Sequence, residues 1–291
     1  MATILDGKLT QEKIREELKI EIDEFREQGL VPGLGIIQVG NRKDSDTYIR
    51  MKERACKSLG IFFMLMPHDE NVSIEHLKES VRFLNENNQI HGIIVQLPLP
   101  IHLNEAEILS VVRKDKDVDG FHPENTGNLM LKRLDKAMVP CTPSGCIELL
   151  DRYDIPLLGK HVVVLGRSNI VGLPMALLAL HRNATISICH SRTENIKEIT
   201  KTADILVCAC GKKEMVDSTW IKEGCVIIDV GINAVEDKTK KSGYRLVGDV
   251  NYKSVIDKVS AITPVPGGVG PMTIGMLLKH TVQAFKNQTF R

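Results

Sequence analysis

The sequence predicts an α/β fold of two domains organised around parallel β-strands. Short apolar runs that end in glycine or proline alternate with helical stretches, and a length of 291 residues exceeds one typical domain. Nearly continuous β-branched runs separated by helices are typical of parallel strands that right-handed crossovers bury on both faces. The strands expected from this pattern are 34–40, 92–100, 161–166, 184–191, 204–211 and 224–231. The expected helices are 10–27, 74–84 and a last one at about 272–285.

Composition excludes several classes of function. A hydrophobic fraction of 43% and a charged fraction of 26% fit a globular protein with an ample core. A net charge of +1 gives no reason to expect a nucleic acid or an acidic membrane as partner. No apolar run approaches the roughly 20 residues that span a bilayer, and the amino terminus lacks a signal-peptide core. We therefore expect no membrane association.

Cysteine usage indicates a reducing compartment. The seven cysteines are an odd number, contain no C-x-x-C motif and lie mostly in apolar runs. This pattern favours reduced, buried thiols over a disulfide framework or a zinc site, so we expect no metal and a cytoplasmic location. A mature mitochondrial form would have the same pattern.

The domain boundary is expected at "MVPCTPSGC" (138–146), where two prolines interrupt the pattern. The last helix follows a long Pro/Gly loop and is expected to pack back on the first domain. The predicted domains are therefore 1–142 with 272–291, and 143–271.

The second domain opens with a strand, a turn and a helix, "HVVVLGRSNIVGLPMALLALHRNA". Gly166 and Gly172 lie six residues apart, which differs from the G-x-G-x-x-G spacing of the standard dinucleotide fingerprint. Glycine still lets the backbone approach a phosphate, and the helix amino terminus supplies N–H donors. The motif predicts a Rossmann-type domain, although a tight turn without a ligand would have the same pattern.

The next strand addresses the choice of nucleotide. "ISICHSR" ends where an NAD enzyme would place an acidic residue on the ribose 2′-hydroxyl. Ser191 and Arg192 stand there instead, with Arg167 in the first loop, and these groups can hold a 2′-phosphate. The prediction is NADP rather than NAD. The alternative is that Arg192 only faces solvent.

The first domain carries the candidates for chemistry. In "SDTYIRMKERACKSLGI", Ser45, Tyr48 and Lys52 are spaced to share one helix face, which is either solvated or directed at a ligand. Gln96 ends the apolar strand in "VQLPLP", where α/β folds place groups that contact ligands, although a glutamine there can also cap the strand.

Two loops complete this set. "RKDKDVDGFHPENTG" contains Asp115, Asp117 and Asp119, but it lacks the later glutamate of an EF-hand, so no calcium site is expected. In "ITPVPGGVGPMT" (262–273) prolines fix the path and glycines allow a flat ligand to approach the backbone, although the loop can also be only a connector.

Together these motifs resemble the methylenetetrahydrofolate dehydrogenase/methenyltetrahydrofolate cyclohydrolase family. Seven stretches match in family order from about residue 35 to 280: "YIRMKERACKSLGI", "GIIVQLPLP", "KDVDGFH", "PCTPSGC", "GRSNIVGLPMA", "CHSRT" and "TPVPGGVGPMT". The resemblance implies a homodimer of two-domain subunits, with a cleft between an amino-terminal α/β domain and an NADP-binding Rossmann domain. It also implies tetrahydrofolate derivatives as substrates, in one-carbon metabolism and purine biosynthesis.

The resemblance assigns roles to individual residues. By similarity Lys52 is the catalytic lysine and Gln96 works with it. Tyr48 stacks on the folate and can offer its hydroxyl as a further catalytic group, and Asp119 binds the pterin. Pro266 and Gly267 match the loop beside the substrate. The expected cofactor-binding positions are Gly166, Arg167, Ser168, Gly172, Ser191, Arg192, Ile232 and Thr273.

The expected chemistry is consistent with these residues. Hydride removal from 5,10-methylenetetrahydrofolate leaves a cation that N5 and N10 stabilise, so it needs positioning rather than a strong base. Hydrolysis of the methenyl bridge needs proton transfer, for which Lys52 must be neutral, and a cationic ligand favours the neutral amine.

Three other interpretations compete with this one. A monofunctional dehydrogenase of this family is expected to lack the lysine. A shikimate-dehydrogenase-like enzyme shares the architecture, but it does not predict Tyr48, Lys52 and Gln96 together. A non-catalytic NADP-binding regulator would have no reason to keep all these residues. An NAD-using relative that binds free phosphate and Mg²⁺ also remains compatible with the two arginines.

Overall fold

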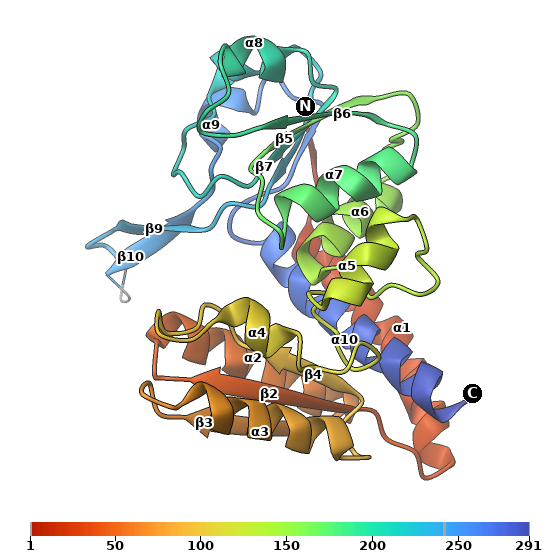
Figure 1. Ribbon diagram of the computed structural model, residues 1–291. Coiled ribbons are helices and arrows are strands. Elements are labelled where there is room, and N and C mark those ends of the chain that lie inside the picture. Colours follow the sequence, from red (N-terminus) through yellow and green to blue (C-terminus); the bar gives the residue numbers. More distant parts are fainter. Residues whose placement is uncertain (1, 241–242, 291) are drawn as a thin grey trace. The chain divides into compact units, whose positions relative to one another are not determined.

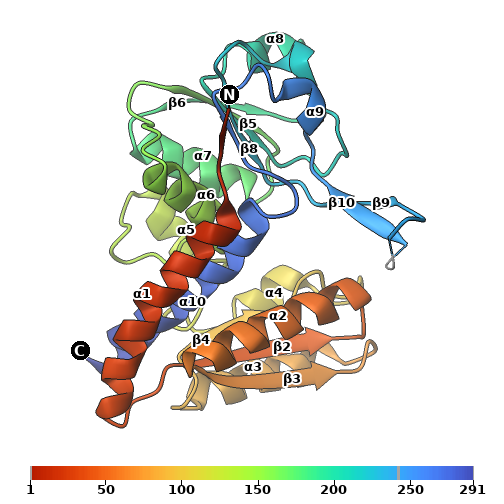
Figure 2. The same ribbon diagram turned by 180° about the vertical axis from the view of Figure 1, so that it is seen from behind.

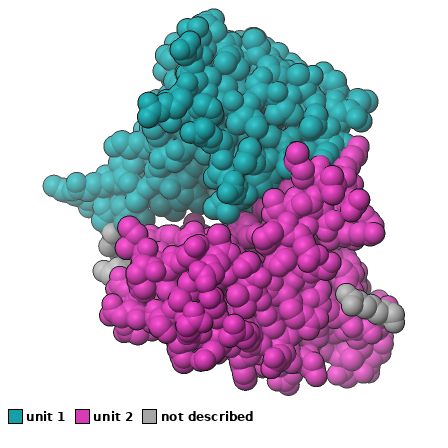
Figure 3. Space-filling model, viewed as in Figure 1, with its two compact units in different colours: residues 1–11, 142–273 teal, residues 12–141, 274–291 magenta. Residues whose placement is uncertain are grey.

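The computed structural model describes residues 2–240 and 243–290, and the chain divides into two compact units (Figure 3). Unit 1 contains residues 1–11 and 142–273, and unit 2 contains residues 12–141 and 274–291. The chain crosses from one unit to the other three times, and each crossing lies within a helix. No helix in the described part of the chain is long and apolar enough to cross a membrane.

Unit 1 is built on a six-stranded parallel sheet (Figure 1). Its strand order is β1-β11-β8-β7-β5-β6. The strands are β1 (Thr3–Ile4), β5 (His161–Leu165), β6 (Thr185–Cys189), β7 (Ile205–Cys208), β8 (Val226–Asp229) and β11 (Ala261–Ile262). The helical segments of this unit are α7 (Gly172–His181), α8 (Ile196–Lys201), η1 (Ser218–Trp220) and α9 (Tyr252–Val255), with most of α6 (Cys141–Arg152).

Strand β5 is the point at which the strand order of this sheet reverses. The chain runs from β5 outward to β6 on one side, and then returns to place β7 on the other side of β5. Valine and isoleucine fill the central strands, which helices cover on both faces, so β7 and β8 are buried along their whole length. In doubly wound sheets, ligands bind at the carboxyl ends of the strands that flank such a switch point.

Unit 2 contains a smaller parallel sheet of order β3-β2-β4. Its strands are β2 (Gly33–Val39), β3 (Phe62–His68) and β4 (Gly92–Val95). Its helices are α2 (Lys43–Leu59), α3 (Ile74–Glu86), α4 (Glu105–Leu109) and α5 (Pro123–Met130), with most of α1 (Gly7–Glu27) and α10 (Val269–Thr289). The two long helices α1 and α10 run side by side (Figures 1 and 2), and the rings of Phe25 and Phe285 lie 5.0 Å apart between them.

The parallel α/β fold predicted from the sequence is confirmed, but neither strand β3 nor the β9–β10 strand pair was predicted. Strand β3 is an edge strand of alternating burial that contains Pro67, which is tolerated because an edge strand has a free side. Strands β9 (Asn233–Glu236) and β10 (Tyr244–Val247) form an antiparallel hairpin. Its sequence is too polar to give an apolar run.

The amino-terminal strand belongs to a different unit from the one that the predicted boundaries gave it. Thr3 and Ile4 of β1 pair with Ala261 and Ile262 of β11, at the edge of the large sheet. Residues 1–11 therefore group with unit 1, whereas residues 274–291 group with unit 2.

Candidate active site

Helix α2 and the end of β4 bring Lys52 and Gln96 together. Lys52 Nζ donates a hydrogen bond to Gln96 Oε1 over 3.0 Å. Gln96 is itself fixed, because its backbone N–H donates to Ile37 O (2.9 Å) and its Nε2 donates to Leu97 O (3.0 Å). The amide oxygen is thereby directed at the amine, so it holds Lys52 without adding charge.

Tyr48 lies one turn before Lys52 on the same helix. Residues four apart on a helix share a face, so α2 presents the phenol and the amine in one direction. Tyr48 is 37% exposed, whereas Ser45 at the beginning of the same row is 9% exposed. Gly60, in the left-handed region at φ 77°, ends the helix with its N–H bonded to Cys56 O and Lys57 O.

In the loop after α4, the side chains of the three predicted aspartates have different partners. Asp115 pairs with Arg113 at 2.6 Å. Asp117 is buried and its carboxylate accepts the backbone N–H groups of Gly120 (3.0 Å) and His122 (2.8 Å). It therefore holds the loop in the turn that carries Asp119, and the three acids do not converge. In the described residues no group of three or more His, Cys, Asp or Glu is arranged to hold a metal ion.

Asp119 is the acid that shares its surroundings with Lys52. Burial raises the pKa of Asp119 to about 6, while the positive charge of Lys52 lowers this pKa and the negative charge of Asp117 raises it. The carboxyl is ionised at neutral pH, and a ligand with two N–H groups would favour its ionised form further.

Two buried side chains that sequence reasoning missed hold the backbone beside Asp119. Burial lowers the pKa of His280, on α10, to about 4, so its ring is neutral, and Nδ1 lies 3.1 Å from Val118 O. The Cys141 thiol donates its single hydrogen to the same carbonyl oxygen over 3.3 Å. A lone histidine in an apolar helix and a cysteine before a proline motif carry no pattern that would have identified them.

The turn after β5 is shaped by its two glycines. Gly166 has φ 131°, and a Cβ there would lie 2.2 Å from Ala209 O, at the end of the neighbouring strand β7. A Cβ at Gly172 would lie 2.4 Å from Gly166 O. Ser168 Oγ accepts the N–H groups of Val171 (3.1 Å) and Gly172 (3.3 Å) where α7 begins. The turn therefore has room for backbone only, as close approach to a phosphate requires.

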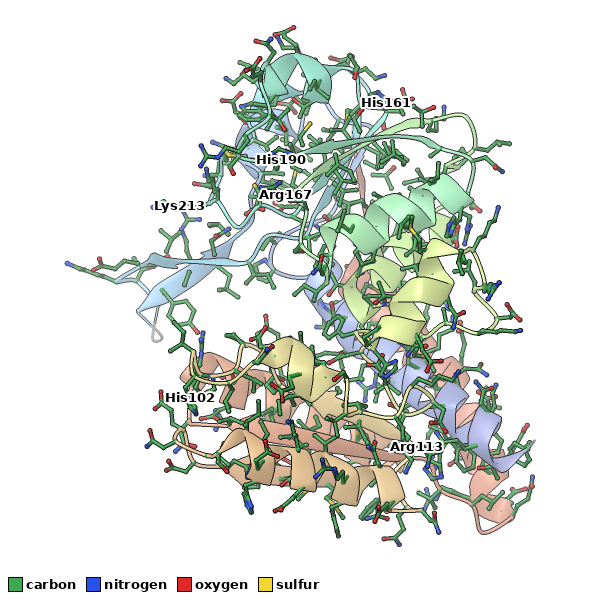
Figure 4. The ribbon with its side chains drawn as sticks, in the orientation of Figure 1. His102, Arg113, His161, Arg167, His190 and Lys213 are labelled. Carbon is green, nitrogen blue, oxygen red and sulfur yellow. The ribbon has the colours of Figure 1, made fainter. Side chains whose placement is uncertain are left out.

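Basic side chains lie near this turn, in the loops that follow β5 and β6; we call Arg167, Ser191 and Arg192 the basic edge. Arg167 follows β5 and His190 follows the adjacent strand β6, and Figure 4 shows both on the same side of the sheet. Ser191 and Arg192 come directly after His190, and all but His190 are exposed. Among the described residues neither arginine forms an ion pair with a carboxylate, so both are available to an anion.

The next predicted residues follow β8 and β11, at the carboxyl ends of strands in the other half of the same sheet. Ile232 follows β8, is 46% exposed, and its Cδ1 would contact a Cβ at Gly270 at 3.6 Å. Pro266 and Gly267 lie in the loop before α10, where Gly267 O accepts the Lys8 N–H at 3.0 Å.

Thr273 is a predicted cofactor position whose side chain has a partner within the protein, as Ser168 does. Its Oγ1 lies 3.1 Å from Thr142 Oγ1, where α6 and α10 meet within unit 1. Unit 2 thus holds Tyr48, Lys52, Gln96 and Asp119, and unit 1 holds the other ten predicted residues. The latter are Gly166, Arg167, Ser168, Gly172, Ser191, Arg192, Ile232, Pro266, Gly267 and Thr273.

A parallel sheet with a glycine turn at its switch point, and a second unit carrying a lysine, a glutamine and an aspartate, define a two-domain α/β enzyme with a dinucleotide-binding unit. The family model "Tetrahydrofolate dehydrogenase/cyclohydrolase, catalytic domain" matches residues 5–119, and the corresponding "NAD(P)-binding domain" model matches residues 140–289. The chain belongs to this tetrahydrofolate dehydrogenase/cyclohydrolase family, which confirms the resemblance found in the sequence.

Three relatives illustrate the closeness. "Bifunctional protein FolD 4, chloroplastic" of Arabidopsis thaliana is 53% identical over 286 residues, which are 98% of this chain and 79% of that protein. The FolD enzyme of Campylobacter jejuni superposes with a TM-score of 0.95 at 44% identity, covering 99% of this chain and 100% of that one. The Trypanosoma brucei enzyme, solved with NADP and an inhibitor, gives 0.95 at 42% identity, covering 100% and 99%.

Proposed function

We propose that the protein oxidises 5,10-methylenetetrahydrofolate with NADP⁺ and hydrolyses the resulting 5,10-methenyltetrahydrofolate to 10-formyltetrahydrofolate. The observation that carries this proposal is the 3.0 Å bond between Lys52 and Gln96, with Asp119 close enough for its pKa to respond to the lysine. A monofunctional dehydrogenase has no use for this pair. The domains that follow are a folate-binding unit 2 and a cofactor-binding unit 1.

The oxidation step asks little of the protein beyond orientation. The folate loses a hydride from the carbon between N5 and N10, and these nitrogens stabilise the cation that remains. NADP⁺, when bound, accepts that hydride. Asp119 accepts two N–H groups from the pterin and so fixes the folate, while the Tyr48 ring stacks on it.

Hydrolysis uses residues of unit 2 alone. Water adds to the methenyl carbon, and Lys52, in its neutral form, takes one of the water protons. The bond from carbon to N5 then breaks as the protonated Lys52 gives that proton to N5 and the hydroxyl of the intermediate loses its proton to solvent, which leaves a formyl group on N10. Gln96 holds the amine in place through the hydrogen bond from Lys52, so the nitrogen lone pair has a defined direction.

A spectrophotometric assay of Lys52→Met tests the bifunctional assignment. We expect oxidation to continue while methenyl hydrolysis falls about 10²- to 10⁴-fold, so that methenyl product accumulates. Lys57→Met is the matched control, because Lys57 lies on the same helix but is exposed and pairs with Glu53 at 2.6 Å. Accumulation of methenyl product by the wild type itself would leave the protein a dehydrogenase only.

The basic edge supports NADP as the cofactor. Arg167, Ser191 and Arg192 lie at the ends of adjacent strands with no acidic residue where one would repel a 2′-phosphate. The relative from Trypanosoma brucei was solved with NADP. Running the same assay with NAD, with and without phosphate and Mg²⁺, separates this proposal from the NAD-using alternative.

We also propose that the protein forms a homodimer through the edge of the large sheet. Strand β6 is an edge strand, Ile188 on it is 37% exposed, and Leu173 and Leu180 on the adjacent α7 are 39% and 53% exposed. Exposed apolar side chains beside an unpaired edge favour association. Light scattering should give a dimer for the wild type and a monomer for Leu180→Glu. A monomeric wild type at micromolar concentration would contradict the proposal.

A reducing compartment such as the cytoplasm is the location that we propose. All seven cysteines are free, and six of them are buried. Burial raises the pKa of thiols such as Cys146 and Cys225 to about 12, so they stay protonated and unreactive. Fractionation of the source cells with an antibody to the protein tests this location.

A further inference from the structure

Two buried carboxylates join the loops at the carboxyl ends of β7 and β8. The first is Asp249, which follows the β9–β10 hairpin and is 0% exposed. Its Oδ2 accepts the backbone N–H groups of Cys210 (2.8 Å) and Gly211 (2.9 Å), which follow β7. Its Oδ1 accepts Asn233 Nδ2 (3.0 Å), which follows β8. One side chain therefore ties two neighbouring loops together.

The second carboxylate fixes the first. Asp229 ends β8, and its Oδ1 accepts the backbone N–H groups of Gly231 and Asp249, each at 3.0 Å. Its Oδ2 accepts the N–H of Val250, also at 3.0 Å. The fit excludes larger neighbours, because a Cβ at Gly248 would lie 1.8 Å from Asp229 Oδ2. A Cβ at Gly231 would lie 2.3 Å from Asp249 Oδ1.

The backbone that these carboxylates hold lies at the carboxyl ends of β7 and β8, next to the Gly166 turn. Ile232 lies between Gly231, whose N–H donates to Asp229, and Asn233, whose side chain donates to Asp249. Ala209 precedes Cys210, and its carbonyl oxygen closes one side of the Gly166 turn. A dinucleotide that places its phosphates at that turn extends over the ends of β7 and β8.

We propose that Asp249, held by Asp229, is a positioning residue for the cofactor. This inference rests on the proposed NADP-dependent function. Asp249 does not touch the cofactor; it sets the path of the β7 and β8 loops on which the nicotinamide half of the dinucleotide lies.

Asp249→Asn tests this role because it keeps the size of the side chain and removes an acceptor. An amide has one oxygen, so its NH₂ group must face either the Cys210 and Gly211 N–H groups or the Asn233 NH₂ group. Two donors then oppose each other in a buried place, and the loops shift. We expect NADP to bind about tenfold more weakly by titration calorimetry. Methenyl hydrolysis, which needs no cofactor, should stay within about twofold of the wild-type rate.

Asp204→Asn is the matched control. Asp204 precedes β7, at the amino end of this strand and so at the opposite end from Asp249. Its carboxylate accepts the His161 N–H at 2.8 Å and pairs with Lys222. It should lose stability without a change in NADP affinity. Asn233→Ala removes only one bond to Asp249 and should give a smaller loss of affinity, which keeps the test informative if Asp249→Asn does not fold.

Each outcome decides the question. Unchanged NADP affinity in Asp249→Asn and Asn233→Ala overturns the inference, and so does an equal loss of NADP binding and methenyl hydrolysis, because that indicates a general structural role. If the wild type binds NADP but turns over no folate, the proposed function fails. The comparison of binding constants and unfolding temperatures among the variants still decides the role of Asp249.

Discussion

The two candidate sites differ in what forms them: side chains form the folate site, whereas backbone forms the cofactor turn. In unit 2 the site consists of side chains, namely Lys52 on Gln96 and Asp119 beside the lysine. In unit 1 the turn around Gly166 is made of backbone packed so closely that a Cβ has no room. A side-chain site is sensitive to charge and pH, whereas a backbone site is sensitive to volume, and substitutions can separate the two.

Gly166→Ala should have the largest effect. The new Cβ would lie 2.2 Å from Ala209 O at a φ of 131°, so the turn must move. A displacement of about 1 Å is expected to weaken productive NADP binding about 10²-fold. Gly224→Ala is the control, because Gly224 also has a positive φ of 74° but no atom within 4 Å of its Cβ. Equal NADP constants for the two variants would contradict a backbone-shaped site.

A change of pH should affect the candidate folate site and leave the Gly166 turn unchanged. The pKa of Asp119 is raised from 3.8 to about 6, so the carboxyl is ionised above pH 6 and protonated below it. A protonated acid is uncharged and has a donor on one oxygen, so it cannot accept one N–H group on each oxygen, and folate affinity should fall about tenfold between pH 7.5 and 5. Fluorescence titration with unreduced folate measures this, and Asp119→Asn should bind weakly with no pH dependence. A flat wild-type curve would exclude Asp119 as the anchor.

His280→Leu should have the smallest effect. It removes the donor that lies 3.1 Å from Val118 O, so Asp119 is less firmly placed, and KM for the folate should rise about threefold. His91→Leu is the control, because His91 is also a neutral histidine of unit 2, with a pKa of about 4, and its Nδ1 accepts the Gly33 N–H. Both variants should lose stability, and only His280→Leu should change KM.

The fold was predictable from the sequence wherever burial left a pattern. Strands such as β7 and β8 are apolar except for Asp229 at the end of β8, because both faces are covered, and their positions follow from composition alone. The β9–β10 hairpin is largely exposed and gives no continuous apolar run, whereas β3 has the apolar run FFMLM before Pro67 and was missed although this pattern was present. Strand β1 is only two residues long, and its pairing with β11 depends on a contact across most of the chain.

The site was predictable only for residues that lie within recognisable motifs. Lys52 and Gln96 are 44 positions apart, and each belongs to a long motif, although only the structure gives their hydrogen bond. The three aspartates at 115, 117 and 119 look equivalent in sequence, but the turn directs Asp117 into backbone N–H groups. His280 was missed because its role depends on where α10 packs, and no local pattern encodes that position.

The pairing of β1 with β11 affects the order in which the two units can be completed during synthesis. Thr3 is synthesised 258 residues before its partner Ala261. Unit 1 is complete after residue 273, and unit 2 must still wait for residues 274–291. No single cut in the gene therefore releases either unit by itself, because neither unit is one continuous segment of the chain.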